Sequence, residues 1–206
     1  MQAYMKSAMP FHGVPSPTLK VVARALFAKL LLPSVDVWRG HMVELWRGAS
    51  FREERYAALI LAGDRRARVF QGPDLLPLYE ELIVTGAWWD YVDEIASDRI
   101  GPILLAHPRQ LAPAMRAWSQ STDPWKRRAS IISQLRFKER TDLGLLYDCI
   151  GPSIGSREFF LRKAIGWALR EYAKTDPEAV RLYVSDHEAD LSGLSRREAL
   201  RQIERR

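Results

Sequence analysis

The sequence contains very little cysteine and histidine, and it has no long apolar run. The one cysteine, Cys149, excludes an internal disulfide framework, and the four histidines lack the spacing of metal ligands. The opening stretch MQAYMKSAMPFHG is not apolar enough for a signal peptide, and no segment approaches the length of a membrane span. Gly-rich phosphate loops are absent as well. We therefore expect a cytoplasmic protein in a reducing compartment, with no metal, no organic cofactor and no membrane association.

Length and charge set further limits on the protein. The 206 residues are 47% hydrophobic, which is enough for one sizeable core, so we expect a single domain over residues 1–206 and a monomer. The net charge is +6 and the isoelectric point is near 9.6. A basic surface is compatible with nucleic acid, although it does not identify a partner by itself.

Alternating strand patterns are scarce, and helix signals recur along the chain. Ser16-Pro17, Asp123-Pro124 and Asp176-Pro177 each place a capping side chain before a proline suited to the first helical position. Residues 50–53 and 195–198 have the spacing of capping boxes. The amphipathic windows between these signals include LKVVARALFAKLL, VDVWRGHMVELW and FFLRKAIGWALREYA. We predict an all-α protein of about ten to twelve helices.

The helix starts are regularly spaced. They fall near Ser50, Trp88, Asp123 and Ser156. The intervals of roughly 33 to 38 residues are close to the size of a two-helix solenoid repeat. In three of these helices a basic residue precedes small and apolar ones: Arg55, Arg128 and Lys163. A repeat would place these side chains along one concave face, although any helical protein can produce such loose matches, and that alternative stays open.

The stretch AWWDYVDE contains two adjacent tryptophans and three carboxylates. On a helix, Trp88, Val92 and Ile95 share one face, which is apolar and should enter the core. Trp89 and Asp93 are also four residues apart and lie on the neighbouring face. A ring face beside a carboxylate resembles half of a cage for a cation. Alternatively, Trp89 packs at the edge of the core while Asp93 pairs with an arginine.

Other segments add to this pair. Trp167 lies inside a helical window, with Lys163 one turn before it and Arg170 one turn after it. If successive repeats project equivalent positions into one groove, that groove would hold Trp89, Asp93, Arg128 and Trp167. Arginines suit phosphates, whereas two rings and a carboxylate suit a cationic group held between them.

Several segments resemble the AlkD-type DNA alkylation-repair glycosylases. They are YMKSAMPFHGVPSP, LIVTGAWWDYVDEIA, DPWKRRASIISQLRFK, SREFFLRKAIGWALREYAKTDPE and LSRREALRQI. The resemblance covers nearly the whole chain in order. It implies a curved, right-handed superhelical solenoid of HEAT-like repeats that wraps duplex DNA on its concave face. It also implies hydrolysis of the N-glycosidic bond of cationic N3- and N7-alkylated purines, without base flipping.

The resemblance also implies roles for single residues. Asp93 matches the catalytic aspartate, Trp89 and Trp167 match the tryptophans that flank the lesion, and Arg128 matches the groove arginine. Arg128 is expected on a phosphate, or otherwise in a salt bridge with Asp93. The expected DNA contacts are Tyr4, Ser16, Arg128, Arg136, Lys138, Lys163 and Arg170. Family members usually have an additional helix before the YMK segment, and this chain begins almost at that point, either because its start is truncated or because this member is shorter. Both alternatives leave the N-terminal DNA contacts open and the expected central cleft unchanged. A DNA-repair role would also place the protein at the nucleoid.

Two other function classes fit the sequence. Helical solenoids often bind proteins, in which case Trp89 and Trp167 are interface anchors and the basic groove receives an acidic peptide. A DNA-structure-binding protein without catalytic activity is the other alternative. Replacing Asp93 with Asn distinguishes them, because only a glycosylase would keep DNA binding and lose turnover.

Overall fold

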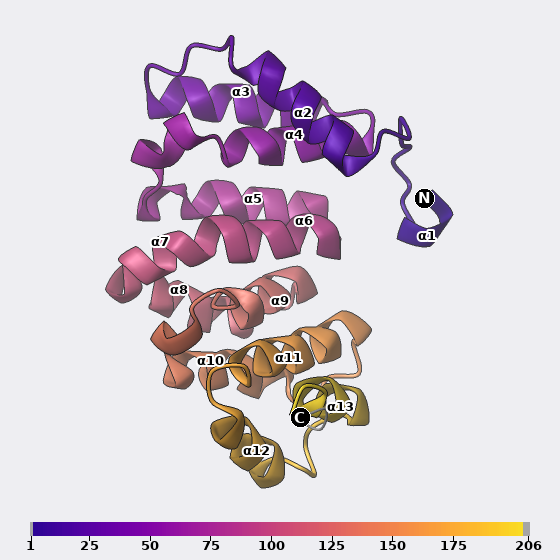
Figure 1. The fold of residues 1–206 in the computed structure, drawn as a ribbon, viewed down its shortest axis with the longest axis vertical. Coiled ribbons are helices and arrows are strands. Elements are labelled where there is room, and N and C mark those ends of the chain that lie inside the picture. Colours follow the sequence, from indigo (N-terminus) through magenta and orange to yellow (C-terminus); the bar gives the residue numbers. More distant parts are fainter. Residues whose placement is uncertain (1, 204–206) are drawn as a thin grey trace. The chain divides into compact units, whose positions relative to one another are not determined.

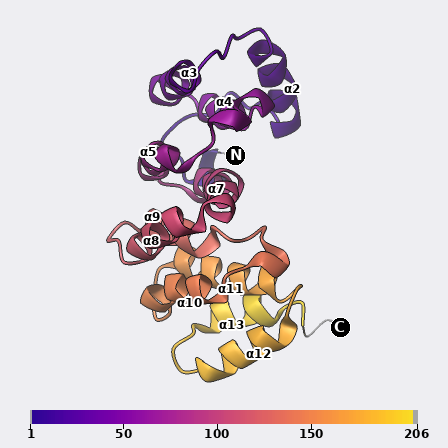
Figure 2. The same cartoon turned by 90° about the vertical axis from the view of Figure 1, so that its left-hand side faces the viewer.

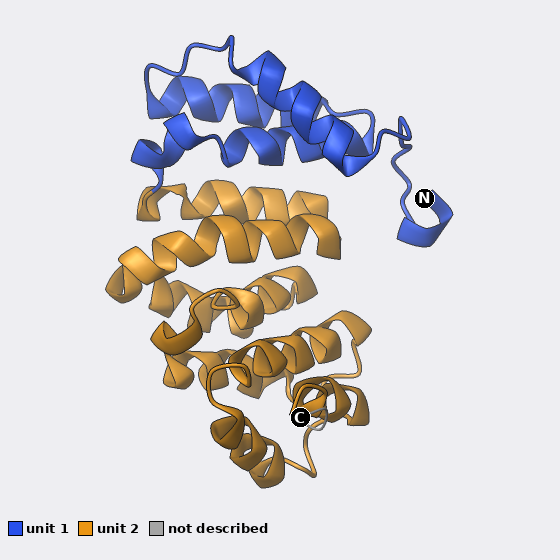
Figure 3. Ribbon diagram, viewed as in Figure 1, with its two compact units in different colours: residues 1–71 blue, residues 72–206 orange. Residues whose placement is uncertain are grey.

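The computed structural model describes residues 2–203 and is entirely helical in that part of the chain (Figure 1). No β-strand occurs in the described residues, so the predicted all-α class is confirmed. The chain divides into two compact units, residues 1–71 and residues 72–206 (Figure 3). The expected single domain and the superhelical curvature stay predictions. A search of residues 2–203 for a helix long and apolar enough to span a membrane found none.

The described residues of the first unit form four α-helices, the first of them very short, and one 3₁₀ helix. Its elements are α1 (Gln2–Met5), α2 (Ser16–Phe27), α3 (Val35–Gly48), α4 (Arg52–Ala62) and the 3₁₀ helix η1 (Arg65–Phe70). Helix α4 packs against both α2 and α3. Trp38, Met42 and Trp46 are four residues apart on α3 and are completely or almost completely buried, so one stripe of this helix forms the core of the unit.

The second unit contains the remaining helices. They are η2 (Pro73–Leu75), α5 (Leu76–Gly86), α6 (Trp89–Glu94), the π-helical segment η3 (Ile95–Ile100), α7 (Gly101–Ala106), α8 (Pro108–Ser119), α9 (Pro124–Ile132), η4 (Lys138–Arg140), α10 (Leu143–Ile150), η5 (Gly151–Ser153), α11 (Phe159–Tyr172), α12 (Pro177–Asp186) and α13 (Gly193–Leu200). The described residues thus hold more α-helices than expected, partly because η3 divides one run into α6 and α7. Within the second unit most neighbouring helices pack on one another in chain order, whereas α11 packs mainly against α9 and α13 (Figures 1 and 2).

The second helix of each predicted repeat begins close to its expected position. Helices α4, α6, α9 and α11 begin at Arg52, Trp89, Pro124 and Phe159. Their starts are about 35 residues apart, which is the spacing of a two-helix repeat. Within the second unit, α9 contacts both α6 and α11, so the helices of three successive predicted repeats are neighbours.

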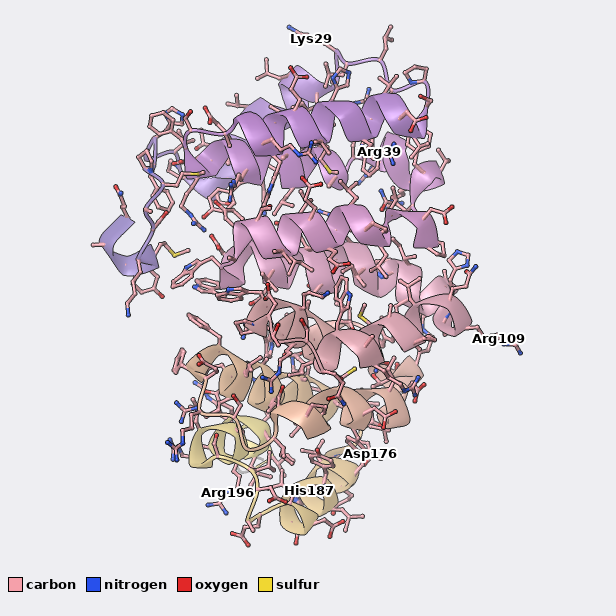
Figure 4. The ribbon with its side chains drawn as sticks, turned by 180° about the vertical axis from the view of Figure 1, so that it is seen from behind. Lys29, Arg39, Arg109, Asp176, His187 and Arg196 are labelled. Carbon is pink, nitrogen blue, oxygen red and sulfur yellow. The ribbon has the colours of Figure 1, made fainter. Side chains whose placement is uncertain are left out.

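Two predicted N-caps are confirmed. The Asp123 carboxylate accepts hydrogen bonds from the backbone N–H groups of Trp125 and Lys126, at 2.7 and 3.3 Å, and starts α9. Asp176 accepts the N–H of Ala179 at 2.9 Å and starts α12. Figure 4 labels Asp176 and His187, the residues that flank this helix. A local signal suffices here because the cap and its donors are neighbours in sequence.

Three other cap predictions were wrong. Ser16 is itself the first residue of α2, and the cap is Pro15. At α4 the back-bonding carboxylate is Glu54, which accepts the N–H groups of residues 50 and 51 at 2.6 and 3.0 Å. Glu53 instead accepts the N–H groups of residues 12, 13 and 14 at 2.9 to 3.2 Å. A loop 40 residues away supplies these donors, which no local pattern reveals.

The predicted capping box at residues 195–198 fails for a similar reason. Ser192 caps α13 by accepting the N–H of Ser195 at 3.0 Å. Ser195 is buried inside the helix, where its hydroxyl donates to the carbonyl of Arg162 on α11. Glu198 turns towards two cations of α11 rather than back towards the cap. Packing between α11 and α13 therefore replaces the local motif.

Candidate functional site

Helix α6 carries the first half of the candidate site, which we define as Trp89, Asp93, Arg128 and Trp167. Val92 and Ile95 are fully buried, as predicted. Trp88 does not share their helical face, because it is the extended N-cap residue before α6 and is only half-buried. Its backbone carbonyl accepts the N–H of Val92 at 3.1 Å and so begins the helix. The prediction that Trp88 is a helical core residue was wrong.

Trp88 belongs to a cluster of aromatic rings between three helices. Its ring centroid lies 5.8 Å from that of Trp125 on α9 and 5.2 Å from that of Phe160 on α11. Trp125 and Phe160 are 5.1 Å apart, so the three rings contact one another mutually. Such pairs contribute about 0.5–1.5 kcal/mol beyond the area they bury. This cluster fixes the N-terminal ends of α6, α9 and α11 together.

Trp89 and Asp93 lie four residues apart on α6, on the face beside the buried stripe. Trp89 is half-buried, and 14% of the Asp93 side chain is exposed. Because both residues lie within α6, they share one helical face, as the sequence predicted. This face of α6 therefore carries a half-buried ring and a largely buried carboxylate.

Arg128 of α9 holds the Asp93 carboxylate in a two-point ion pair. Its Nε donates to Oδ1 at 2.7 Å, and its Nη2 donates to Oδ2 at 2.8 Å. The third nitrogen, Nη1, donates to the backbone carbonyl of Phe160 at 2.5 Å. Only 5% of the Arg128 side chain is exposed. Of the two roles expected for Arg128, the structure has the salt bridge, and a phosphate could reach this guanidinium only if it left these partners.

The electrostatics of Asp93 reflect opposing effects. Burial raises the pKa of this carboxyl above its ordinary value, and repulsion from Asp90 acts in the same direction, whereas the Arg128 guanidinium lowers the pKa. The net direction is upward. A planar guanidinium bonded to both oxygens still leaves lone pairs on the carboxylate for a further partner. The carboxyl group is therefore rigidly held and keeps some access for a further partner.

Trp167 lies on α11, which packs against α9, the helix that also contacts α6. It is half-buried, like Trp89. The preceding residue, Gly166, is in tight contact with α13, because a Cβ at this position would lie 2.5 Å from the Cβ of Glu198 and 2.9 Å from the carbonyl oxygen of Ser195. Gly166 thus allows the close approach that anchors the helix carrying Trp167.

The other predicted DNA contacts of the second unit fall into two groups. Lys163 and Arg170, one turn on either side of Trp167, both pair with the same Glu198 carboxylate, at 2.8 and 2.5 Å. These two cations hold the Glu198 pKa below its ordinary value. A DNA phosphate would have to compete with this carboxylate, so both residues have a structural role that the sequence did not indicate.

Arg136 and Lys138 lie beyond the C-terminal end of α9. Arg136 pairs with Asp98 of the π-helical segment, at 2.5 Å, yet it remains largely exposed. Lys138 is exposed, makes no ion pair with the described residues and has a positive φ of 53°. Tyr4 and Ser16 are exposed residues of the first unit. The assignment of all these residues to DNA contacts stays a prediction.

Sequence reasoning missed Phe160, Asp98 and Glu198. Phe160 acts through its backbone carbonyl, which leaves no trace in residue type. Asp98 and Glu198 are partners of arginines and lysines 28 to 38 residues away. No local sequence signal identifies these pairs, because each partner comes from a separate segment of the chain. Residues 2–203 contain no group of three or more His, Cys, Asp or Glu side chains that could hold a metal ion.

Comparisons with known proteins add an independent line of argument. Residues 1–203 match the sequence profile of a family described as "DNA alkylation repair enzyme". A search of curated proteins found no match. Among solved structures, the chain is similar to one described as a predicted DNA alkylation repair enzyme from Enterococcus faecalis. The TM-score is 0.86 and the sequence identity is 29%, over 97% of this chain and 91% of that chain.

The profile match extends over residues 1–203, and the similar structure covers 97% of this chain. The family resemblance noted in the sequence is thereby confirmed. The chain belongs to the family of DNA alkylation repair enzymes.

Proposed function

We propose that this protein is a monofunctional DNA glycosylase that removes cationic N3- and N7-alkylated purines from duplex DNA by hydrolysing the N-glycosidic bond. One observation carries the proposal beyond alkylation repair in general. A largely buried carboxylate, Asp93, is held in fixed orientation by Arg128 and lies beside the half-buried ring of Trp89. This combination suits the stabilisation of a positive charge that appears during a reaction.

The protein does not need to activate the leaving base. An N3- or N7-alkylated purine is already cationic, so it departs without being protonated. As the bond breaks, positive charge moves to the deoxyribose, and the Asp93 carboxylate stabilises that charge and positions the attacking water. Because Arg128 already occupies two lone pairs of the carboxylate, its role here is to orient Asp93 rather than to bind a phosphate.

Trp89 and Trp167 would contact the sugar and backbone at the lesion through their ring faces. Cation–π contacts contribute about 0.5–2 kcal/mol each and would strengthen as oxocarbenium character develops. The two rings come from α6 and α11, which both pack against α9. On this proposal the damaged base stays stacked and is not flipped into a pocket, so selectivity comes from the charge of the leaving group.

The remaining parts of the proposal concern partners and place. The partner is duplex DNA carrying an alkylated purine, bound by a monomer in the cytoplasm near the nucleoid. Phosphate contacts come from exposed cations such as Arg136 and Lys138. A scaffold that binds acidic peptides, or a DNA-structure-binding protein without turnover, is the alternative class.

The test is incubation of the protein with a duplex containing one N7-methylguanine, followed by chromatography of the released base. We expect release of N7-methylguanine and an abasic strand that alkali cleaves. Absence of release together with tight binding to undamaged duplex would instead support the DNA-structure-binding protein. Binding to an acidic peptide with no affinity for DNA would support the scaffold.

A further inference from the structure

The helix that carries Asp93 changes its hydrogen-bonding pattern directly after that residue. The run from Trp89 to Ala106 is continuous, but residues Ile95–Ile100 between α6 and α7 form a π-helix (Figure 1). In such a segment each N–H bonds to the carbonyl five residues back instead of four. Segments of this kind are rare and occur often at functional sites.

Pro102, at the second position of α7, accounts for the wide turn. A proline within a helical run has no N–H to donate, and its ring clashes with the carbonyl four residues earlier, which here belongs to Asp98. The Asp98 carbonyl instead accepts the Nη1 of Arg99 at 3.3 Å. Gly101 leaves no room for a sideways shift, since a Cβ there would lie 2.8 Å from the carbonyl oxygen of Ser133. The backbone therefore widens to a π-helical turn, which contains one residue more than an α-helical turn.

The wide turn changes which side chains face α9. In a regular α-helix, residues five apart point about 140° away from each other. Here Asp93 and Asp98, which are five apart, both pair with arginines of the segment that begins with α9, at 2.7 Å for Arg128 and 2.5 Å for Arg136. Within the same helix, Glu94 and Arg99 are also five apart and pair at 2.8 Å. Residues at this interval are thus brought onto one side.

We propose that Pro102 is a positioning residue for Asp93. By enforcing the π-helical turn, it sets the rotation of α6 relative to α7, while Gly101 fixes α7 against Ser133. If the turn closed to a regular α-helix, the two halves would rotate relative to each other by up to about 100°, the step of one residue. The Asp93 carboxylate would then lose its two-point contact with Arg128. The effect on base excision rests on the proposed function, whereas the effect on the ion pair does not.

The variant Pro102→Ala tests this inference, with Pro113→Ala as the matched control. Both prolines are exposed and lie within helices of the second unit, so each replacement restores an N–H and removes little packing. The first readout is the NMR signal of the Arg128 Nε–H group, identified by its loss in Arg128→Lys. We expect this signal to move or broaden in Pro102→Ala and to stay unchanged in Pro113→Ala.

The second readout is single-turnover excision of N7-methylguanine, measured beside DNA affinity. We expect Pro102→Ala to lower the excision rate by at least about tenfold while the dissociation constant changes by less than about twofold. The control should match the wild type in both. Pro102→Gln, which also restores the N–H, should reproduce the result and thereby exclude a folding defect peculiar to one variant.

The outcomes separate the two proposals. An unchanged Arg128 signal in folded Pro102→Ala overturns the positioning role, whatever the activity. A changed signal in a protein whose wild type releases no base leaves the positioning role standing and rejects the glycosylase. A changed signal with undiminished excision also overturns the inference, because Asp93 would then act without the geometry that Pro102 maintains.

Discussion

Replacing Asp93 with Asn removes one charge with almost no change in shape. In the wild type both carboxylate oxygens accept hydrogen bonds from Arg128, at 2.7 and 2.8 Å. The asparagine oxygen can accept one of these bonds, but its amide group faces a second donor. Removing one partner of a buried pair costs about 3–5 kcal/mol, and the remaining bond reduces this to about 2 kcal/mol. For a chain of this size, the melting temperature should fall by about 4–8 °C.

The catalytic effect follows from the same charge. Two unit charges about 4 Å apart interact by about 4 kcal/mol at an effective dielectric constant of about 20. Part of this interaction exists only when the deoxyribose becomes cationic, so Asp93→Asn should slow excision by about tenfold to a thousandfold. DNA affinity should remain nearly unchanged, because the deoxyribose carries no positive charge for Asp93 to stabilise until the N-glycosidic bond breaks.

The assay uses excess enzyme over a duplex with one N7-methylguanine, at a temperature well below the melting point of the variant. Fluorescence anisotropy gives the dissociation constant on the same duplex. Asp148→Asn is a suitable control, because Asp148 also pairs with an arginine, Arg116, but on the exposed surface of α8 and α10. Undiminished excision by Asp93→Asn, or an equal loss in Asp148→Asn, would refute the catalytic role. An unaltered melting temperature would refute the energetic argument for the buried pair.

Three further predictions address DNA binding, selectivity and packing. Binding to undamaged duplex should weaken steeply with salt, and Arg136→Ala or Lys138→Ala should each reduce the log–log slope by about one, as measured by anisotropy titrations; a slope near zero would support the protein scaffold. A bulky cationic N7 adduct should be released at a rate comparable to N7-methylguanine, and neutral hypoxanthine or 1,N6-ethenoadenine should persist in parallel time courses; efficient release of the neutral bases would indicate a shaped base pocket. Gly166→Ala should destabilise the fold by about 1–3 kcal/mol in denaturant titrations, because the new methyl group overlaps Glu198, and an unchanged midpoint would show that α13 shifts freely.

Much of the local structure could be predicted from the sequence. Asp123 and Asp176 cap their helices as expected, because an N-cap and the N–H groups that it binds are two or three residues apart. The shared face of Trp89 and Asp93 follows from the four-residue interval on a helix. The all-α class and the spacing of helix starts near 35 residues follow from the same short-range periodicities.

The sequence did not predict features that depend on contacts between helices. Glu53 and Glu198 have the spacing of capping residues, but donors and cations from distant segments bind them instead. Trp88 was expected on the buried face of a helix, yet it precedes α6 and packs with rings from α9 and α11. Each of these residues could interact either with its sequence neighbours or with a distant segment, and the sequence pattern reveals only the first kind of contact.

The sequence by itself determined approximately where most helices of this protein begin, that Trp89 and Asp93 share a helical face, and which residue types are available for a charged site. Only the tertiary structure decided that Arg128 pairs with Asp93, that the Phe160 carbonyl takes its third nitrogen, and that the helix widens after Asp93. The physical reason is the range of the interactions. Capping and helical periodicity act within about four residues, whereas an ion pair between residues 35 positions apart exists only once packing has brought their helices together.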